Sequence, residues 1–251
     1  MLEAMRHAWL LVGLALFGCQ SPQSSTVNVM AASSLREVMA DLTCAYQREH
    51  PNQRIVVRHE GSHILRAQAK AGADFDLFVS ANQQQSDALF QAGLTTKAQP
   101  IALNSLVWVV KKRSPAELSS FWHLDQAEGL IVAVPTCPIG QYTLEVLAKA
   151  RHVRGDSFVH ALKARVVSRE ANTKMVLAKL QMSNADAAIV YKSDAMAAEM
   201  DWSALPPQVD VQVTLFAALH TKARQPAKRW LHWLRSEKAL PIWQKRGFEK
   251  P

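Results

Sequence analysis

Residues 54–81 read RIVVRHEGSHILRAQAKAGADFDLFVSA, and this stretch decides the fold. The β-branched residues of RIVVRH (54–59) favour a strand, because branched side chains pack well on a pleated surface. A helical segment follows at 62–72 and ends at Gly72, where a helix C-terminal glycine is expected. DLFVSA (76–81) then predicts a second strand. The order strand, helix, strand is typical of a sheet covered by helices.

The same alternation continues in both directions along the chain. VNVMAA (27–32) predicts a buried strand, and 34–49 predicts a helix with apolar residues at helical spacing. Further strands are expected at 104–112, 129–135, 164–169, 186–194 and 209–220, and further helices at 83–93, 138–152 and 172–182. The pattern predicts an α/β fold with parallel sheets and helices on both faces. Ligands of such sheets bind at the carboxyl ends of the strands, where helix N-termini gather.

Composition supports a folded, basic protein. The chain has 251 residues, of which 49% are hydrophobic and 20% charged, so it can bury a substantial core. The formal net charge is +8, yet Lys and Arg are scattered apart from KKR (111–113) and KARQPAKR (222–229). No nucleic-acid motif accompanies them, so we interpret the charge as a solvated surface and expect no nucleic-acid partner.

The N-terminal residues predict export. AWLLVGLALFG (8–18) is an apolar run of 11 residues, which is too short for a membrane-spanning helix and typical of a signal peptide. The sequence L-F-G-C then resembles a lipobox that ends at Cys19. We expect residues 1–18 to be a lipoprotein-type signal peptide, Cys19 to carry the lipid, and 19–26 to form a polar tether. An ordinary cleaved signal is the alternative, and both place the protein outside the cytoplasm.

The motif HEGSH has two interpretations. His59, Glu60 and His63 match H-E-x-x-H, which on one helix would hold zinc and provide a general base. Gly61 and the preceding β-branched strand oppose a helix across this span, and the extended motif that would supply a third ligand is not matched. A zinc-dependent hydrolase therefore remains the weaker hypothesis, and we interpret the three side chains as surface groups.

The alternative interpretation is a helix start that faces an anion. Ser62 begins a helix after a strand, and Ser34, Ile139 and Thr173 stand at three comparable positions. The first turn of a helix carries unpaired N–H groups and a partial positive charge. Each serine could simply be a helix cap, but four such starts at equivalent strand ends indicate a shared anion site.

Several stretches resemble the molybdate-binding proteins of bacterial ABC importers. The most specific are MAASSLREVM (30–39), GSHILRAQAKAGADFDLFVSAN (61–82) and IVYKSDA (189–195), and the similarity extends over nearly the whole mature chain. It implies a two-lobed periplasmic-binding-protein clamshell, in which helices flank a mixed or mostly parallel sheet in each lobe. Residues 27–104 with 213–251 would form one lobe, and 105–212 the other.

The resemblance also implies a ligand and a site. Ser34 and Ser62 would donate hydroxyl and backbone hydrogen bonds, Ile139 and Thr173 backbone N–H groups, and Tyr191 its phenol hydroxyl. The ligand would be molybdate or tungstate, held as an oxyanion with no metal ligand, no cofactor and no Lys or Arg contact. The protein would be a monomer and not an enzyme, attached to the membrane through the lipid on Cys19, and would deliver the anion to a permease and its ATPase.

Departures from the family pattern keep other ligands open. His63, Cys137, Ile139 and Thr173 replace residues that are commonly smaller or different in the family. A different oxyanion, such as sulfate or phosphate, is therefore an alternative, and an interaction module without a ligand is another.

Three further expectations concern structure. Cys44 and Cys137 are interpreted as free thiols, because we place them in different lobes. Asp76 and Asp194 are interpreted as structural caps or turn residues. The tryptophans at 230, 233 and 243 are spaced for the core face of a helix.

Overall fold

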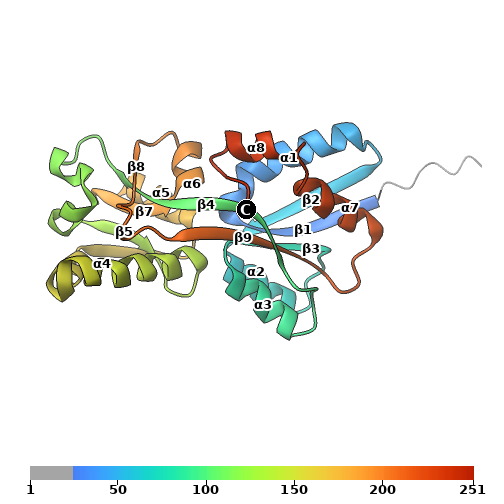
Figure 1. The fold of residues 1–251 in the computed structure, drawn as a ribbon, viewed down its shortest axis with the longest axis horizontal. Coiled ribbons are helices and arrows are strands. Elements are labelled where there is room, and N and C mark those ends of the chain that lie inside the picture. Colours follow the sequence, from blue (N-terminus) through green and yellow to red (C-terminus); the bar gives the residue numbers. More distant parts are fainter. Residues whose placement is uncertain (1–24) are drawn as a thin grey trace, which may run out of the picture.

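The computed structural model describes residues 25–251, which form two lobes joined by two long strands (Figure 1). The predicted signal peptide and Cys19 lie outside the described residues. Strand β1 (Ser25–Ala32) begins at Ser25, so the last two residues of the predicted tether belong to the sheet. Among the described residues, no helix combines the length and apolarity needed to cross a membrane.

The first lobe is a sheet between two helical layers. Its strands lie in the order β2 (Gln53–Glu60), β1, β3 (Leu77–Ser80), β9 (Gln212–Leu219) and the first half of β4 (Gln99–Val110). Helices α1 (Arg36–Glu49), α7 (Gln225–Leu234) and α8 (Leu240–Lys245) lie on one side (Figure 1). Helices α2 (Ser62–Lys70) and α3 (Gln83–Gln91) lie on the other. β1 runs parallel to both β2 and β3, as expected for strands connected through helices.

The second lobe has the same layered plan. Its strands lie in the order β4 (second half), β7 (Ala187–Tyr191), β5 (Leu130–Ala133) and β6 (Val166–Glu170), with β8 (Trp202–Ala204) also paired to β4. Its helices are α4 (Pro138–Ala164), α5 (Thr173–Met182) and α6 (Lys192–Ala197). In Figure 1, α4 covers one side of this sheet and α5 and α6 the other.

Strands β4 and β9 connect the lobes. β4 pairs with β9 as far as Ser105 and with β7 from Leu106 onward. The partner of β4 therefore changes within one residue, and the pair Asn104–Val213 lies beside the change. The predicted lobe boundaries at 104/105 and 212/213 stay a prediction.

The sheets are mixed rather than mostly parallel. Among the described strands, four pairings are parallel and four antiparallel, because β4 and β9 run against their neighbours. The sequence also failed to predict β8 and the two 3₁₀ turns between 116 and 126. Helix α4 extends well beyond His152, with a break at Gly155, whose φ of 80° a glycine adopts without strain.

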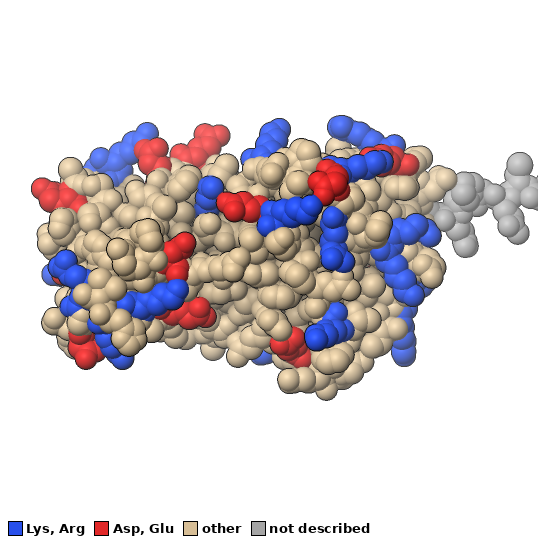
Figure 2. All heavy atoms as spheres, viewed as in Figure 1, with Lys and Arg blue, Asp and Glu red and all other residues tan. Residues whose placement is uncertain are grey.

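The expectations for the three tryptophans and the two cysteines are confirmed. Trp230, Trp233 and Trp243 are buried in the first lobe, and Cys44 and Cys137 are free thiols. Lys and Arg are spread over the surface together with Asp and Glu, as Figure 2 shows for one face.

Candidate functional site

A small cavity between the lobes brings all five predicted binding residues together. Its volume is ≈ 20 Å³. From the first lobe it is lined by Ala32, Ser33, Ser34, Gly61, Ser62 and Ala81. From the second lobe it is lined by Cys137, Pro138, Ile139, Asn172, Thr173 and Tyr191.

The connections from strands to helices position the residues that line this cavity. Strands β1, β2, β5 and β6 are each followed within a few residues by the start of a helix or helical turn that lines the cavity. These starts are the 3₁₀ turn Ser33–Leu35, α2, α4 and α5, and each supplies lining residues. Their first-turn N–H groups have no acceptor one turn earlier, so the cavity is a convergence of hydrogen-bond donors.

The alternative that Ser34 and Ser62 act as helix caps is wrong. Ser34 lies inside the 3₁₀ turn, Gly61 occupies the N-cap of α2, and neither helix start has a side-chain cap. The Ser62 hydroxyl oxygen instead accepts a hydrogen bond from the backbone N–H of Ala81, at 3.2 Å. Both hydroxyl groups therefore keep a proton that can be donated into the cavity.

Gly140 allows the start of α4 to approach the preceding loop closely. A Cβ atom at this position would lie 1.9 Å from the carbonyl oxygen of Val134, which no side chain can tolerate. The thiol of Cys137 donates to the same carbonyl, at 3.1 Å. Burial raises the pKa of Cys137, although the nearby N–H groups of Gly140 and Ile139 act in the opposite direction. The thiol is neutral at pH 7 and would not repel an anion.

The hydroxyl of Tyr191 has no partner. The side chain is 2% exposed, and its oxygen is buried without a hydrogen bond to any described residue. Desolvation raises the pKa of Tyr191 well above 10, so the hydroxyl stays protonated. A buried hydroxyl without a partner costs roughly 1–3 kcal/mol, and a ligand that accepts its proton would remove this cost. Its neighbour Tyr142 instead donates to the carbonyl of Ala81, at 3.2 Å.

No charged side chain is among the residues that line the cavity. Lys174, which directly follows the lining residue Thr173, forms ion pairs with Glu37 and Asp194. The electrostatic character of the site therefore comes from backbone dipoles and neutral hydroxyl groups.

The HEGSH segment is divided between two elements. β2 extends through Glu60, and α2 begins at Ser62, so His59 and His63 are not one turn apart on a helix. The residues described contain no group of three His, Cys, Asp or Glu placed to hold a metal ion. The three side chains are partly buried at the surface rather than fully exposed. Burial lowers the pKa of both His59 and His63.

The two aspartates differ in their surroundings. Asp76 accepts a hydrogen bond from the backbone N–H of Asn28, at 2.8 Å, in the structural role that the sequence predicted. Asp194 lies in the first turn of α6, but it is fully buried and pairs with Lys174 at 3.0 Å. Sequence reasoning missed this ion pair, because Lys174 and Asp194 lie on different helices.

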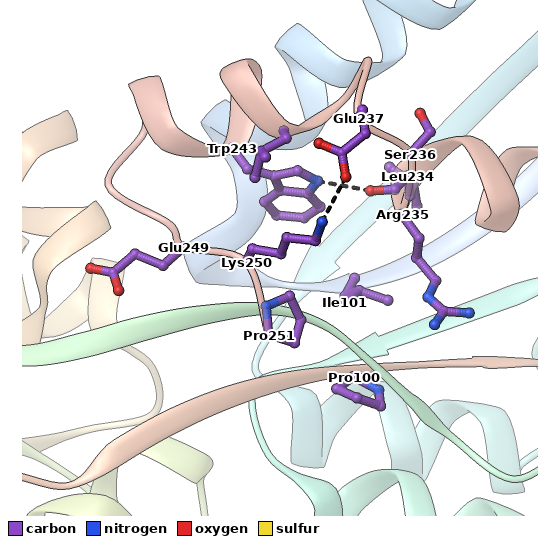
Figure 3. A pocket seen from close by; sticks show the side chains of 11 residues that line it. Pro100, Ile101, Leu234, Arg235, Ser236, Glu237, Trp243, Glu249, Lys250 and Pro251 are labelled. Carbon is purple, nitrogen blue, oxygen red and sulfur yellow. Dashed lines mark hydrogen bonds and ion pairs between the residues drawn. The ribbon is translucent and has the colours of Figure 1, made fainter.

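A larger cavity of ≈ 330 Å³ lies in the first lobe, away from the predicted residues (Figure 3). It is bounded by the C-terminal segment, where Lys250 pairs with Glu237 and the indole N–H of Trp243 donates to the carbonyl of Leu234. None of the five predicted binding residues lines it.

Comparison with known proteins identifies the family. The model of the bacterial extracellular solute-binding proteins matches residues 27–249. The chain belongs to this family.

Two relatives match over nearly their whole length. The chain is 28% identical to the "Putative ABC transporter substrate-binding lipoprotein YvgL" of Bacillus subtilis, over 96% of this chain and 95% of the relative. It is 27% identical to the molybdate-binding protein ModA of Mycobacterium bovis, over 97% and 95%. The solved periplasmic molybdate-binding protein of Azotobacter vinelandii has a TM-score of 0.73 at 18% identity, covering 90% of this chain and 99% of that one. The last similarity shows the shared fold.

Proposed function

We propose that this solute-binding protein carries molybdate or tungstate and delivers it to the permease and ATPase of an ABC importer. The lobes would open and close on the anion by a hinge motion in β4 and β9. The name of the mycobacterial relative supports molybdate, and the name of the Bacillus relative supports a transport role.

The unpartnered hydroxyl of Tyr191 is the observation that carries the proposal. This group lies in a cavity with the starts of four helices or helical turns and with the hydroxyls of Ser34 and Ser62. A tetrahedral dianion only accepts hydrogen bonds, and every one of these groups can donate one. A cation as ligand would be repelled by the same partial charges.

Neutral hydrogen-bond donors at fixed positions would also distinguish molybdate from sulfate. Hydrogen bonds weaken steeply with distance, so an anion with shorter bonds, such as sulfate, would leave donors out of reach. Ile139 and Thr173, however, stand where the family commonly has other residues, and both line the cavity. If they narrow it, a different oxyanion such as sulfate or phosphate becomes the second candidate.

The remaining parts of the proposal concern the chain's chemistry and location. The site would bind without catalysing a reaction, the protein would act as a monomer, and Cys19 would carry a lipid anchor on the exported protein. The word lipoprotein in the name of the Bacillus relative supports the anchor.

Calorimetry on protein from residue 20 onward tests the function, with molybdate, tungstate, sulfate and zinc titrated separately. We expect tight binding of molybdate and tungstate and no heat from sulfate or zinc. Tight binding of sulfate alone would favour the second candidate. Zinc binding without any oxyanion would contradict the proposal.

A further inference from the structure

A cluster of three charged side chains lies beside the cavity and joins the lobes. Lys174 stands in the first turn of α5, in the second lobe. Its ammonium nitrogen lies 2.8 Å from both carboxylate oxygens of Glu37, which belongs to α1 in the first lobe. The same nitrogen lies 3.0 Å from Oδ1 of Asp194 in α6. One cation therefore bridges the cleft and two helices of the second lobe.

Each member of the cluster is close in sequence to a predicted binding residue. Glu37 follows Ser34 by one helical turn, Lys174 directly follows Thr173, and Asp194 is three residues after Tyr191. A shift of Lys174 relative to Glu37 would therefore also shift donors of one lobe relative to donors of the other.

The cluster is shielded enough for its charges to matter. The side chains of Lys174 and Glu37 are 27% and 33% exposed, and that of Asp194 is fully buried. Opening the lobes would separate Lys174 from Glu37 but leave its pairing with Asp194 intact, because that pair lies within one lobe. Partly buried ion pairs are screened less by salt than surface pairs, so the contact favours the closed form.

Of the ion pairs between described residues, only Lys174–Glu37 joins the two lobes. The other polar contacts across the cleft are neutral, such as the amide of Asn82 with Gln141 at 2.5 Å. The ion pair and this amide contact involve different helices, α5 and α4, so they hold the closed cleft at separate points.

We propose that Lys174 and Glu37 form an inter-lobe latch that positions the two sets of donors around the anion without touching it. Its effect on affinity rests on the proposed function. Its effect on lobe closure does not, because the ion pair joins the lobes through protein atoms alone. Lys174 and Glu37 are positioning residues in this proposal.

The test compares Glu37→Ala with Glu49→Ala. Both glutamates lie on α1, and Glu49 pairs with Lys238 at 2.7 Å within the first lobe. Each variant removes one ion pair from the same helix, and both leave the buried Lys174–Asp194 pair intact. Only Glu37→Ala removes the contact that joins the lobes. Equal melting temperatures of the two variants would establish that both are folded.

Small-angle X-ray scattering of the ligand-free proteins is the first readout. We expect a larger radius of gyration for Glu37→Ala than for the wild type and no change for Glu49→Ala. Stopped-flow release of molybdate is the second readout, with dissociation about tenfold faster for Glu37→Ala alone.

Identical scattering of Glu37→Ala and the wild type would overturn the latch, whatever the ligand. An open variant with an unchanged dissociation rate would overturn the positioning role. If the wild type does not bind molybdate, the proposed function fails, but the scattering still decides whether the latch exists.

Discussion

The cavity and the latch face the same cleft but use opposite chemistry. The residues around the cavity are uncharged, and its tyrosine and cysteine stay neutral at pH 7 because burial raises their pKa values. The latch beside it consists of one cation and two carboxylates. Lys174 is thus neutralised within the protein. Under the two proposals, a basic protein leaves recognition of the anion to dipoles and hydroxyl groups, and uses one ion pair to hold the lobes.

The largest effect on molybdate affinity should come from removing hydrogen-bond donors from the uncharged cavity. Ser34→Ala combined with Ser62→Ala removes two hydroxyl donors from the first lobe. A hydrogen bond to a charged group contributes about 1.5–3 kcal/mol, so calorimetry should show molybdate affinity lower by about 10²-fold or more. Ser33→Ala, at a lining residue outside the predicted donor set, is the control. Unchanged affinity in the double variant would exclude these serines as ligands.

Gly140→Ala tests whether the cavity depends on the close approach of α4. The new Cβ would lie 1.9 Å from a backbone carbonyl oxygen, so the helix start must shift. Overpacking typically costs about 1–3 kcal/mol, and urea unfolding should show a loss of at least this size together with weaker binding. Ala148→Gly, on the exposed side of the same helix, should cost only about 1 kcal/mol and leave binding unchanged.

Tyr191→Phe isolates a single donor. Removing its hydroxyl should weaken molybdate binding by about tenfold or more, because one hydrogen bond to the dianion is lost. Without ligand, the variant should be as stable as the wild type or more stable, since no described protein group bonds to the hydroxyl. Tyr142→Phe is the control: it loses a hydrogen bond to Ala81, so stability should fall while binding changes less. Calorimetry and thermal unfolding check both variants.

The charged residues beside the cavity predict that the free energy of unfolding depends on pH. Burial raises the pKa of Asp194 from 3.8 to about 6, although Lys174 acts in the opposite direction. The folded protein thus binds this proton more tightly than the unfolded chain, so the stability that protonation provides is lost as pH rises from about 4 through 6. Between pH 4 and 8 the wild type should lose about 2 kcal/mol relative to Asp194→Asn, measured by denaturant unfolding. Parallel pH profiles of the two proteins would contradict the shift.

The smallest effect is expected at the motif that resembles a zinc site. His59→Ala should leave molybdate affinity within about twofold, because His59 lies on β2 and is not among the residues that line the cavity. A variant that lost both molybdate and zinc binding would return the metal hypothesis to consideration.

The sequence predicted the α/β alternation and the gathering of the four helix starts, because both depend on local patterns at strand ends, whereas only the family resemblance indicated Tyr191. RIVVRH and DLFVSA are strands, and Ser62 begins a helix between them. The antiparallel crossing of β4 and β9 was missed, since pairing between residues about 110 positions apart leaves no local pattern.

Two features of the site also depend on long-range contacts. Capping by Ser34 and Ser62 is a good local expectation, but Gly61 takes the N-cap and Ser62 instead bonds to Ala81. The Lys174–Glu37 pair joins residues 137 positions apart, so neither spacing nor composition could predict it.

A crystal structure of the protein with molybdate, located by the anomalous scattering of molybdenum, tests the central claim most directly. The account predicts one molybdenum peak between Ser34, Ser62, Ile139, Thr173 and Tyr191, with no Lys or Arg nitrogen within hydrogen-bond distance of the anion. A peak elsewhere, or a Lys or Arg side chain bonded to the anion, would contradict it.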